Sequence, residues 1–301
     1  MTEGIGVLMA MLSSSIGGGA TAFIRYLVAV TDPVTLAALR FGSGFLLLLP
    51  IAFWRSSPWP RGGDWPGVIG LGVLFFGLCF GLFNWALSFT TASRGALAMS
   101  TLPLLTMIAG AVLGVERLTA RKSAGVIIAV GGVALALLAG LASAPAGAWR
   151  GDLIVVGAAL CMALYSVWSR PFIRRSSALA FVTASMGAGS GCLAIIAALH
   201  GGYAAVASYG AAQWLALLYL GAIASSLSFF LWVSALERTT PTRVAATLTL
   251  NPITASILAV FLLGEPIGAN LVAGIAAVLA GIWIASTETR RQPQRVLPGK
   301  T

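Results

Sequence analysis

The side chains that could do chemistry in this sequence are polar residues inside long apolar runs. Arg40 lies in such a run, about seven residues or roughly 10 Å beyond Pro33 at 1.5 Å per residue. A charge at that depth in a bilayer is costly, and a guanidinium there could hold a substrate carboxylate through two parallel hydrogen bonds. A second interpretation stays open, in which Arg40 extends to the nearer headgroups or binds free carbonyls.

A stretch of small residues interrupts the first apolar run, where Ser13 to Ser15 are followed by Gly17 to Gly19. Ser14 and Ser15 are candidate substrate contacts, and Gly18 is a candidate hinge. Small residues also let membrane helices pack closely, so this stretch could equally be a helix contact.

Amides and aromatic side chains in other runs could line a cavity for a partly apolar solute. Trp85 and Trp232 are equally typical of the aromatic belt at a membrane surface. Asn84, Tyr165 and Asn251 are stronger candidates, because a lipid-facing amide or phenol would lack partners. The candidates for the cavity wall are Asn84, Trp85, Tyr165, Trp168, Ser228, Trp232 and Asn251.

Two prolines, Pro103 and Pro252, occupy matching places in two apolar runs. A proline removes an amide donor and frees a carbonyl in the preceding turn, and paired helix breaks point to a transporter site. Pro103 and Pro252 are therefore candidate gating residues, with Ser100 and Thr101 as polar groups beside the first break. The alternative is that both prolines only curve their helices.

The residues that most enzymes need are missing from the apolar runs. Every carboxylate falls near a run end or in a loop, and His200 is the single histidine. The three cysteines have no paired spacing. The sequence therefore predicts no enzyme, no metal site and no cofactor, and it shows no proton relay of the usual type.

The elements that must position these residues are transmembrane helices. Hydrophobic residues make up 58% of the 301-residue chain and charged residues only 9%, which excludes a water-soluble domain. The net charge of +10 does not indicate nucleic-acid binding, because the basic residues lie between apolar runs. Runs of about 20 residues predict an all-α integral membrane protein. The predicted spans are 4–30, 34–53, 66–89, 92–115, 122–143, 152–170, 178–199, 213–236, 243–263 and 267–287.

The chain repeats itself after 149 positions. This shift places Arg94 on Arg243, Glu116 on Glu265, and Pro103 on Pro252. Five spans per copy is an odd number, so the second copy enters the bilayer from the opposite side, as in transporters that work by alternating access. The predicted domains are two inverted repeats, 1–147 and 148–288, followed by a basic cytoplasmic tail at 289–301.

Basic residues fix the expected orientation. With the N-terminus inside, most of the 18 lysines and arginines fall in cytoplasmic segments. Both termini are therefore expected in the cytoplasm.

Arg40, the run that ends in Pro103 and Glu116, the glycine-spaced fifth span and their second copy resemble the EamA-type transporters of the drug/metabolite transporter superfamily. The resemblance implies a multi-pass exporter of small metabolites in the cell (inner) membrane, with a central cavity and peripheral fifth and tenth helices. Exporters of aromatic and other amino acids belong to that superfamily.

The function that this reading favours is export of amino acids, including aromatic ones, or of related amphipathic solutes. The alternative is a sugar-nucleotide or phosphate antiporter of the same superfamily, although such substrates call for several buried cations. The expected partners are a small-molecule substrate and the lipid bilayer, with no nucleic acid. No oligomeric state follows from the sequence.

The orientation gives a first testable prediction. Reporter fusions at Arg55, Lys122 and Arg238 should read cytoplasmic, because basic residues concentrate on that side. Fusions near Trp149 and Tyr209 should read external. A cytoplasmic reading at Tyr209 would contradict the inverted arrangement.

Overall fold

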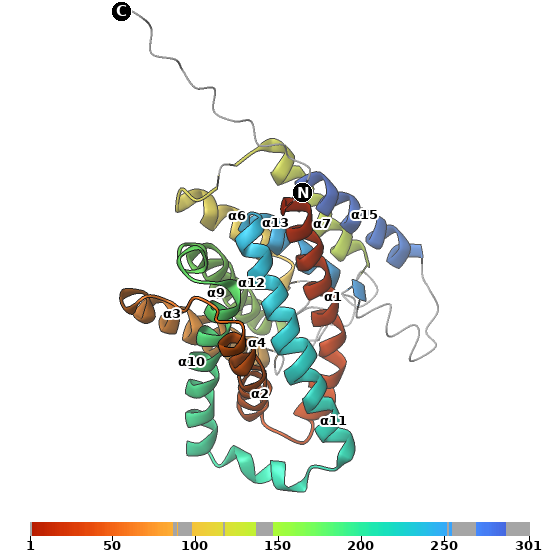
Figure 1. Cartoon of the computed structure of the whole chain (residues 1–301). Helices are drawn as coiled ribbons and strands as arrows, with labels where there is room; N and C mark the ends of the chain where they lie inside the picture. The colour runs from red at the N-terminus through yellow and green to blue at the C-terminus, as the bar shows by residue number, and fades with distance from the viewer. Residues whose placement is uncertain are drawn as a thin grey trace, which may run out of the picture.

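The computed structural model describes residues 2–86, 89, 98–116, 118–136, 147–251, 253–254 and 269–286, and this part of the chain is helical without a strand (Figure 1). The helices are α1 Thr2–Val28, α2 Pro33–Trp54, η1 Gly62–Asp64, α3 Trp65–Gly72, η2 Val73–Cys79, α4 Phe80–Ala86, α6 Leu102–Val112, α7 Ala120–Ala136, α9 Ala148–Arg175, α10 Ala178–Leu199, η3 Gly202–Ser208, α11 Ala211–Tyr219, η4 Leu220–Leu227, α12 Ser228–Arg238, α13 Pro241–Ala246, η5 Thr247–Thr249 and α15 Ala269–Ser286.

Five of these stretches are long and apolar enough to cross a membrane. They coincide with the predicted spans that begin at residues 34, 66, 152, 178 and 213. Helix α1 covers most of the predicted span 4–30. The predicted spans 92–115, 122–143, 243–263 and 267–287 fall only partly within the described residues, and Pro252 and the tail 289–301 fall outside them. The five stretches are Pro33–Trp54, Gly62–Ala86, Ala148–Arg175, Ala178–Leu199 and Ala211–Arg238.

Local sequence fixes where two of these helices begin. Asp32 caps α2, because its Oδ1 accepts the backbone N–H groups of Val34 and Thr35 at 3.0 and 2.9 Å. Pro33 at the first helical position needs no such partner. Ser177 caps α10 in the same way. Sharp starts of this kind allow short connections between successive membrane-crossing helices.

Two helices contain a widened, π-helical segment. The segment η2 lies between α3 and α4, and η4 lies between α11 and α12. The shift of 149 residues places one almost on the other. In η4, the Ser226 hydroxyl donates to the carbonyl of Gly221, five residues earlier, at 2.8 Å. Such segments are rare and often occur at functional sites.

The helices α7 and α15 pack along each other through glycines. A side chain at Gly125 would meet backbone atoms of Gly281 and Ala285, and one at Gly132 would meet Gly274. Under the shift of 149, Gly125 corresponds to Gly274 and Gly132 to Gly281, so the contact is reciprocal. Without Cβ atoms, the two backbones approach closely enough for dispersion contacts along their length.

Glycines also make the contacts between α2, α10 and the π-helical segments. A Cβ at Gly44 would lie 3.0 Å from Ser225 Cβ in η4, and one at Gly189 would lie 2.5 Å from the Gly72 carbonyl beside η2. Each repeat thus supplies a helix that packs against the widened helix of the other. The core next to this crossing is aromatic, and its rings are Phe41, Phe75, Phe76, Phe80 and Phe229.

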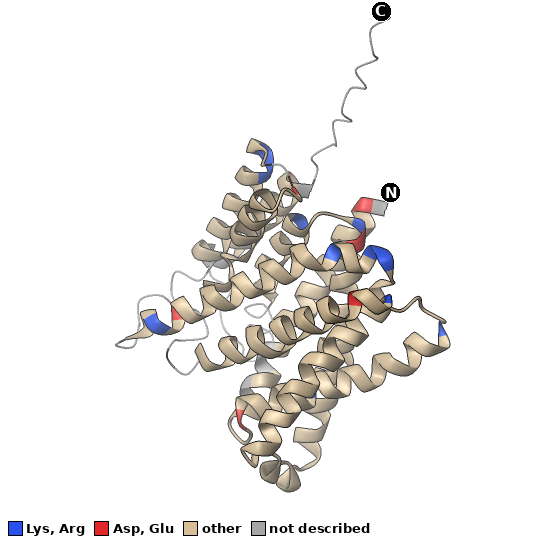
Figure 2. Ribbon diagram, turned by 90° about the vertical axis from the view of Figure 1, so that its left-hand side faces the viewer, with Lys and Arg blue, Asp and Glu red and all other residues tan. Residues whose placement is uncertain are grey.

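Most charged residues lie away from the middle of the helices, and Arg40 inside α2 is an exception. Figure 2 shows them mostly near helix ends, and many lie at the end of the bundle that holds the N-terminus. Long uncharged stretches lie between, as expected for helices whose flanks face hydrocarbon. The exposed apolar side chains on these flanks include Leu8, Leu46, Val112 and Leu199.

The α7–α15 contact gives the second prediction. Gly132→Leu should destabilise the protein by about 1–3 kcal/mol, because a side chain there would overlap α15. Gly131→Leu is the matched control, since a Cβ at Gly131 has no neighbour within 4 Å. Thermal unfolding in detergent should show a lower midpoint for the first variant only. Equal midpoints would contradict the close packing of the two helices.

Candidate functional site

Arg40 is buried within the bundle, with 7% of its surface exposed. Its Nε donates to the Ser225 hydroxyl at 2.9 Å, and Nη2 reaches the Ala224 carbonyl at 3.4 Å, both in η4. Its guanidinium also lies 4.9 Å from the ring centre of Phe41 and 5.6 Å from that of Phe80. The charge is therefore held by the opposite repeat and by aromatic faces.

A small cavity lies beside this guanidinium. Its walls include Ile24, Leu36, Phe80 and Asn84, and its volume is about 10 Å³. That is room for one water-sized group. The Asn84 amide donates to the Pro33 carbonyl at 3.3 Å, which fixes its position at the wall. The structure thus brings two predicted residues, Arg40 and Asn84, to one cavity.

A second cluster joins α1 to helices of the other repeat. The Ser13 hydroxyl donates to the Ser228 carbonyl at 2.7 Å, and the Ser228 hydroxyl donates to the Ser13 carbonyl at 3.0 Å. Ser14 Oγ lies 3.0 Å from Thr247 Oγ1. These hydroxyls are buried away from water, so they depend on each other for hydrogen bonds.

Asn251 lies next to this cluster, against the glycines of α1. A Cβ at Gly17 would fall 3.3 Å from the Asn251 side-chain amide, and one at Gly18 would fall 2.4 Å from its carbonyl oxygen. Gly18 therefore allows α1 to pass close to the backbone at Asn251. Asn251 Oδ1 and Trp232 Nε1 are buried and have no hydrogen-bond partner in the described part of the chain. Such groups are costly unless something completes them.

Tyr165 is fully buried beneath η2. Its ring stacks on Phe75 with centres 4.2 Å apart, and its hydroxyl lies 3.5 Å from Ser185 Oγ. The phenol thus finds a partner in the bundle, and its ring extends the aromatic core. This packing accounts for its burial without a ligand.

Other predicted site residues are not brought into these clusters. Trp85 and Trp168 are 55% and 43% exposed, and Trp85 packs edge-on against Phe89. Ser15 is half-buried. Ser100 is buried, and Thr101 Oγ1 donates to the Ala98 carbonyl at 2.7 Å.

The helices that carry Pro103 and Asn251 are both interrupted. Residues 100–101 form a turn, and Pro103 follows in the first turn of α6. The matching stretch of the second repeat, Thr247–Thr249, is a short 3-10 turn, η5. The breaks therefore lie at corresponding places, where tighter turns leave carbonyls available to other partners.

Charged contacts join the two repeats at the end that holds the N-terminus. Glu116 accepts from Lys122 Nζ at 2.5 Å and from the Thr242 backbone N–H at 3.1 Å. The side chains of Glu116 and Lys122 are 4% and 7% exposed. Arg243 pairs with Glu3 and donates to the Ala285 carbonyl at 3.1 Å. This network, Glu3, Glu116, Lys122 and Arg243, fastens α1, α13 and α15 together.

Sequence reasoning did not single out Ser13, Ser225 or Thr247, although they complete the polar clusters. Hydroxyl residues are common in apolar helices, so only their partners distinguish them. The repeat was the available signal for the charged network, because Arg243 and Glu116 both belong to the duplicated motif. No group of three or more metal-binding side chains occurs among the described residues.

The two copies of the repeated sequence both match a known family. The model of the EamA-like transporter family matches residues 4–138 and again residues 149–287. The chain belongs to this family. The resemblance drawn from the duplicated motif is thereby confirmed, and this EamA-like protein is a multi-pass membrane protein of the transporter class.

Several relatives share almost the whole length of this EamA-like chain. An uncharacterized transporter of Bacillus subtilis is 26% identical and covers 94% of each chain. An uncharacterized protein of Pseudomonas aeruginosa is 31% identical over 83% of each. A probable terminal-alkyne amino-acid exporter of Streptantibioticus cattleyicolor is 27% identical over 80% of each. A solved crystal structure, 20% identical, matches 94% of this chain and 96% of its own with a TM-score of 0.75, which shows a shared fold.

The charged network gives the third prediction. Glu116→Gln should destabilise the protein by roughly 3–5 kcal/mol, because it leaves the buried Lys122 ammonium without its counter-charge. Thermal unfolding should show this loss, and the double variant Glu116→Gln with Lys122→Met should recover much of it. The measurement is a double-mutant cycle on the unfolding midpoint.

Glu237→Gln is the matched control, since Glu237 pairs with Arg238 at 3.1 Å on the surface, with both side chains about 40% exposed. Its midpoint should stay close to that of the parent protein. If the unfolding midpoint of Glu116→Gln is as close to that of the parent protein as the midpoint of this control, the network does not stabilise the fold.

Proposed function

We propose that this protein is a secondary transporter that exports amino acids, including aromatic ones, or related small amphipathic metabolites by alternating access. The observation that carries the proposal is Arg40, a buried guanidinium beside a cavity that it shares with Asn84. A guanidinium in an apolar interior suits a carboxylate, through charge-assisted hydrogen bonds. The rings of Phe41 and Phe80 beside it suit an apolar or aromatic side chain of the solute.

The name of one relative supports this class of solute. The Streptantibioticus cattleyicolor protein, which matches 80% of this chain, bears the name of an amino-acid exporter. An amino acid offers a carboxylate, an ammonium and a side chain. Asn251 Oδ1 and Trp232 Nε1, both buried and without a hydrogen-bond partner among the described residues, supply an acceptor and a donor in the same bundle.

The way in which the repeats meet supports the proposal of alternating access. The reciprocal contacts of α7 with α15 support two inverted repeats, 1–147 and 148–288, related by an axis in the membrane plane. The charged network closes the end that holds the N-terminus. The cavity beside Arg40 holds only a water-sized group, so a solute enters only after the repeats separate.

The remaining candidate residues take positions around this path. Ser14 and Ser228 bind across the repeats and must exchange partners when the repeats move. Ser100, Thr101 and Pro103 lie at one helix break, and the sequence repeat pairs Pro103 with Pro252. We place the protein in the cell (inner) membrane with both termini in the cytoplasm, because its basic residues concentrate on that side.

A sugar-nucleotide or phosphate antiporter is the second candidate of the same superfamily. A phosphate dianion calls for several cations at one place. Lys122 and Arg243 already pair with Glu116 and Glu3, and Arg40 is the cation among the described side chains that line the cavity. One guanidinium matches one carboxylate, so the amino-acid class fits better.

Arg40 gives the fourth prediction. Arg40→Gln should lower kcat/KM for carboxylate-bearing solutes roughly 10- to 100-fold, the effect of losing a charge-assisted pair. Decarboxylated analogues of the same solutes should be transported equally well by both proteins. The measurement is uptake into inside-out vesicles, screened over amino acids and their amine analogues, at matched protein abundance.

Two further variants complete the test. Arg40→Lys keeps the charge without the planar fork, and it should retain part of the activity. Arg150→Gln changes an exposed arginine of α9 that contacts the Trp149 ring, and it should leave transport unchanged. Equal loss for solutes and analogues in Arg40→Gln would make Arg40 a structural residue and remove the proposed carboxylate contact.

A further inference from the structure

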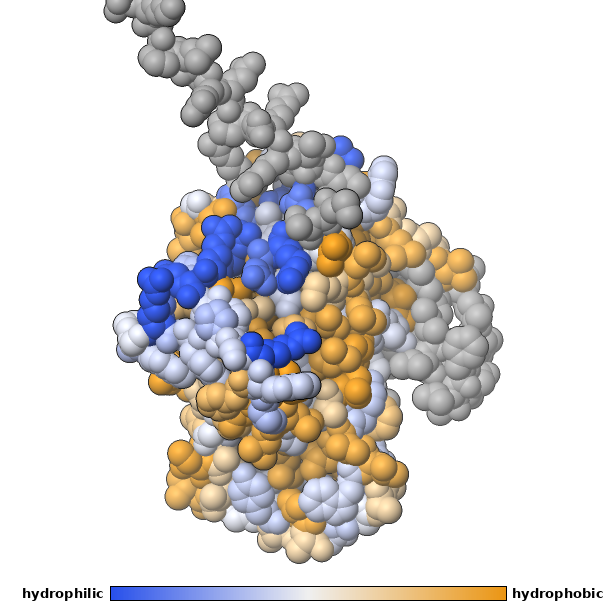
Figure 3. Space-filling view, viewed as in Figure 1, coloured by the Kyte–Doolittle hydropathy of each residue, from blue (hydrophilic) through white to orange (hydrophobic). Residues whose placement is uncertain are grey.

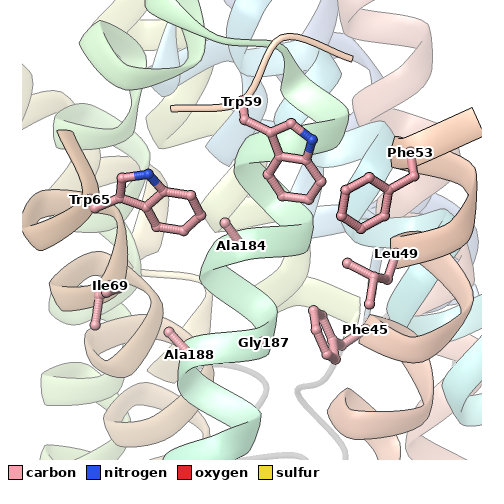
Figure 4. A pocket seen from close by; sticks show the side chains of 9 residues that line it. All are labelled: Phe45, Leu49, Phe53, Trp59, Trp65, Ile69, Ala184, Gly187 and Ala188. Atoms are coloured by element: carbon pink, nitrogen blue, oxygen red, sulfur yellow. The ribbon is translucent and has the colours of Figure 1, made fainter. Parts of the chain in front are cut away.

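A groove of about 490 Å³ opens on the surface between α2, α3 and α10, away from the cavity at Arg40 (Figure 4). Its sides are Phe45, Leu49 and Phe53 on α2 and Ile69 on α3, and its floor is α10. A Cβ at Gly187 would lie 2.7 Å from the Phe45 ring, so the glycine lets this ring lie against the floor. The groove has the size of a ligand pocket and a lining without charge.

Two tryptophans stand at one end of the groove. Trp59 and Trp65 lie nearly parallel, with ring centres 6.5 Å apart and an interplanar angle of 14°. Phe53 packs against Trp59 at 5.2 Å. Figure 4 shows the indole nitrogens of both tryptophans at the upper edge of the groove, beside the connection from α2 to α3. Indoles placed this way mark the boundary between hydrocarbon and headgroups.

The connection that carries Trp59 is held in place by the other repeat. Asp64 accepts two hydrogen bonds from Arg175 at the end of α9, at 2.7 and 3.0 Å. The Ser177 backbone N–H donates to the Pro58 carbonyl at 3.1 Å. These three hydrogen bonds fix the mouth of the groove before anything binds.

Positive charge surrounds the same mouth. Arg55 ends α2 and Arg61 precedes η1, so one lies before Trp59 and the other after it. Both are exposed, and within the described chain neither has a carboxylate oxygen within salt-bridge distance. Asp64 binds Arg175 directly, and the charge of Arg61 acts on it from farther away. In Figure 3, hydrophilic residues gather in the upper part of this side of the molecule and hydrophobic residues lie below them.

From this arrangement we propose that the groove binds an anionic phospholipid, with one acyl chain against α10 and the phosphate on Arg55 and Arg61. The apolar lining takes the chain, the indole N–H groups face the ester and headgroup region, and the two guanidinium groups neutralise the phosphate. In the proposed orientation this is the cytoplasmic leaflet. The site is independent of the transported solute.

A second copy of the protein fits the groove less well. A symmetric contact through this face would bring Arg55 and Arg61 of both copies together, and like charges across an interface are unfavourable. The phosphate of an anionic lipid attracts both arginines, so its binding causes no repulsion between like charges.

Quenching of tryptophan fluorescence by brominated lipid tests the proposal. The full-length protein is reconstituted in phosphatidylcholine bilayers that contain a minor fraction of either phosphatidylglycerol or phosphatidylcholine brominated on the acyl chains. Phosphatidylglycerol should quench more strongly, and Trp59→Phe should remove most of the difference. The variants Arg55→Gln and Arg61→Gln should each lower the relative affinity for phosphatidylglycerol about fivefold. This is the contribution of one basic residue near an anionic surface.

Two controls make the outcome decisive. Arg150→Gln alters a similar arginine beside a tryptophan, Trp149, and should leave the preference intact. Ala188→Phe fills the groove floor and should abolish the preference while transport continues. Equal quenching by the two brominated lipids, or a preference that persists in the double variant of Arg55 and Arg61, would overturn the proposal. A dimer whose Trp59 is shielded from both lipids would assign the groove to a second copy and overturn it as well.

Discussion

Buried polar groups in an apolar interior need partners, and in this protein several of them find their partners across the boundary between the two repeats. Ser13 binds Ser228, Ser14 binds Thr247, and Arg40 binds Ser225. None of these pairs lies within one repeat. Because hydrocarbon offers no replacement for a lost hydrogen bond, the boundary between the repeats decides which relative positions are stable. The same boundary holds the candidate solute contacts, so in the proposed mechanism stability and transport depend on one set of groups.

Much of the fold follows from the sequence alone. Apolar runs of about 20 residues predict helices because only internal hydrogen bonding satisfies a backbone in lipid. The five long apolar stretches lie where they were predicted. The duplication around Arg94 and Arg243 predicted the family, and Arg40 and Asn84 were found by the cost of placing a polar group at depth. Their shared cavity came from the structure.

The partners of these residues could not be predicted from the sequence. Trp85 and Trp232 have the same chemistry, yet Trp85 is exposed, whereas Trp232 is buried and its N–H group has no partner among the described residues. Only the packing of neighbouring helices decides whether a tryptophan lies in the membrane-surface belt or in the interior. Ser225 binds Arg40 from within the π-helical segment η4. Periodicity near 3.6 residues does not reveal such a segment, because it is apolar like the helix around it and contains no proline.

The π-helical segment η2 has a geometric consequence for the aromatic core. In an α-helix, residues five apart point about 140° away from each other, given 3.6 residues per turn. In a π-helix they share a face, and Phe75 and Phe80 accordingly meet with ring centres 5.4 Å apart. Deleting one residue here would do more than shorten the span. It would rewind the turn and rotate everything beyond it, swinging Asn84 away from the guanidinium that now shares its cavity. The number of residues in this segment therefore determines the rotation of the following helix about its axis, whereas in a surface loop it determines only the distance that the loop can span.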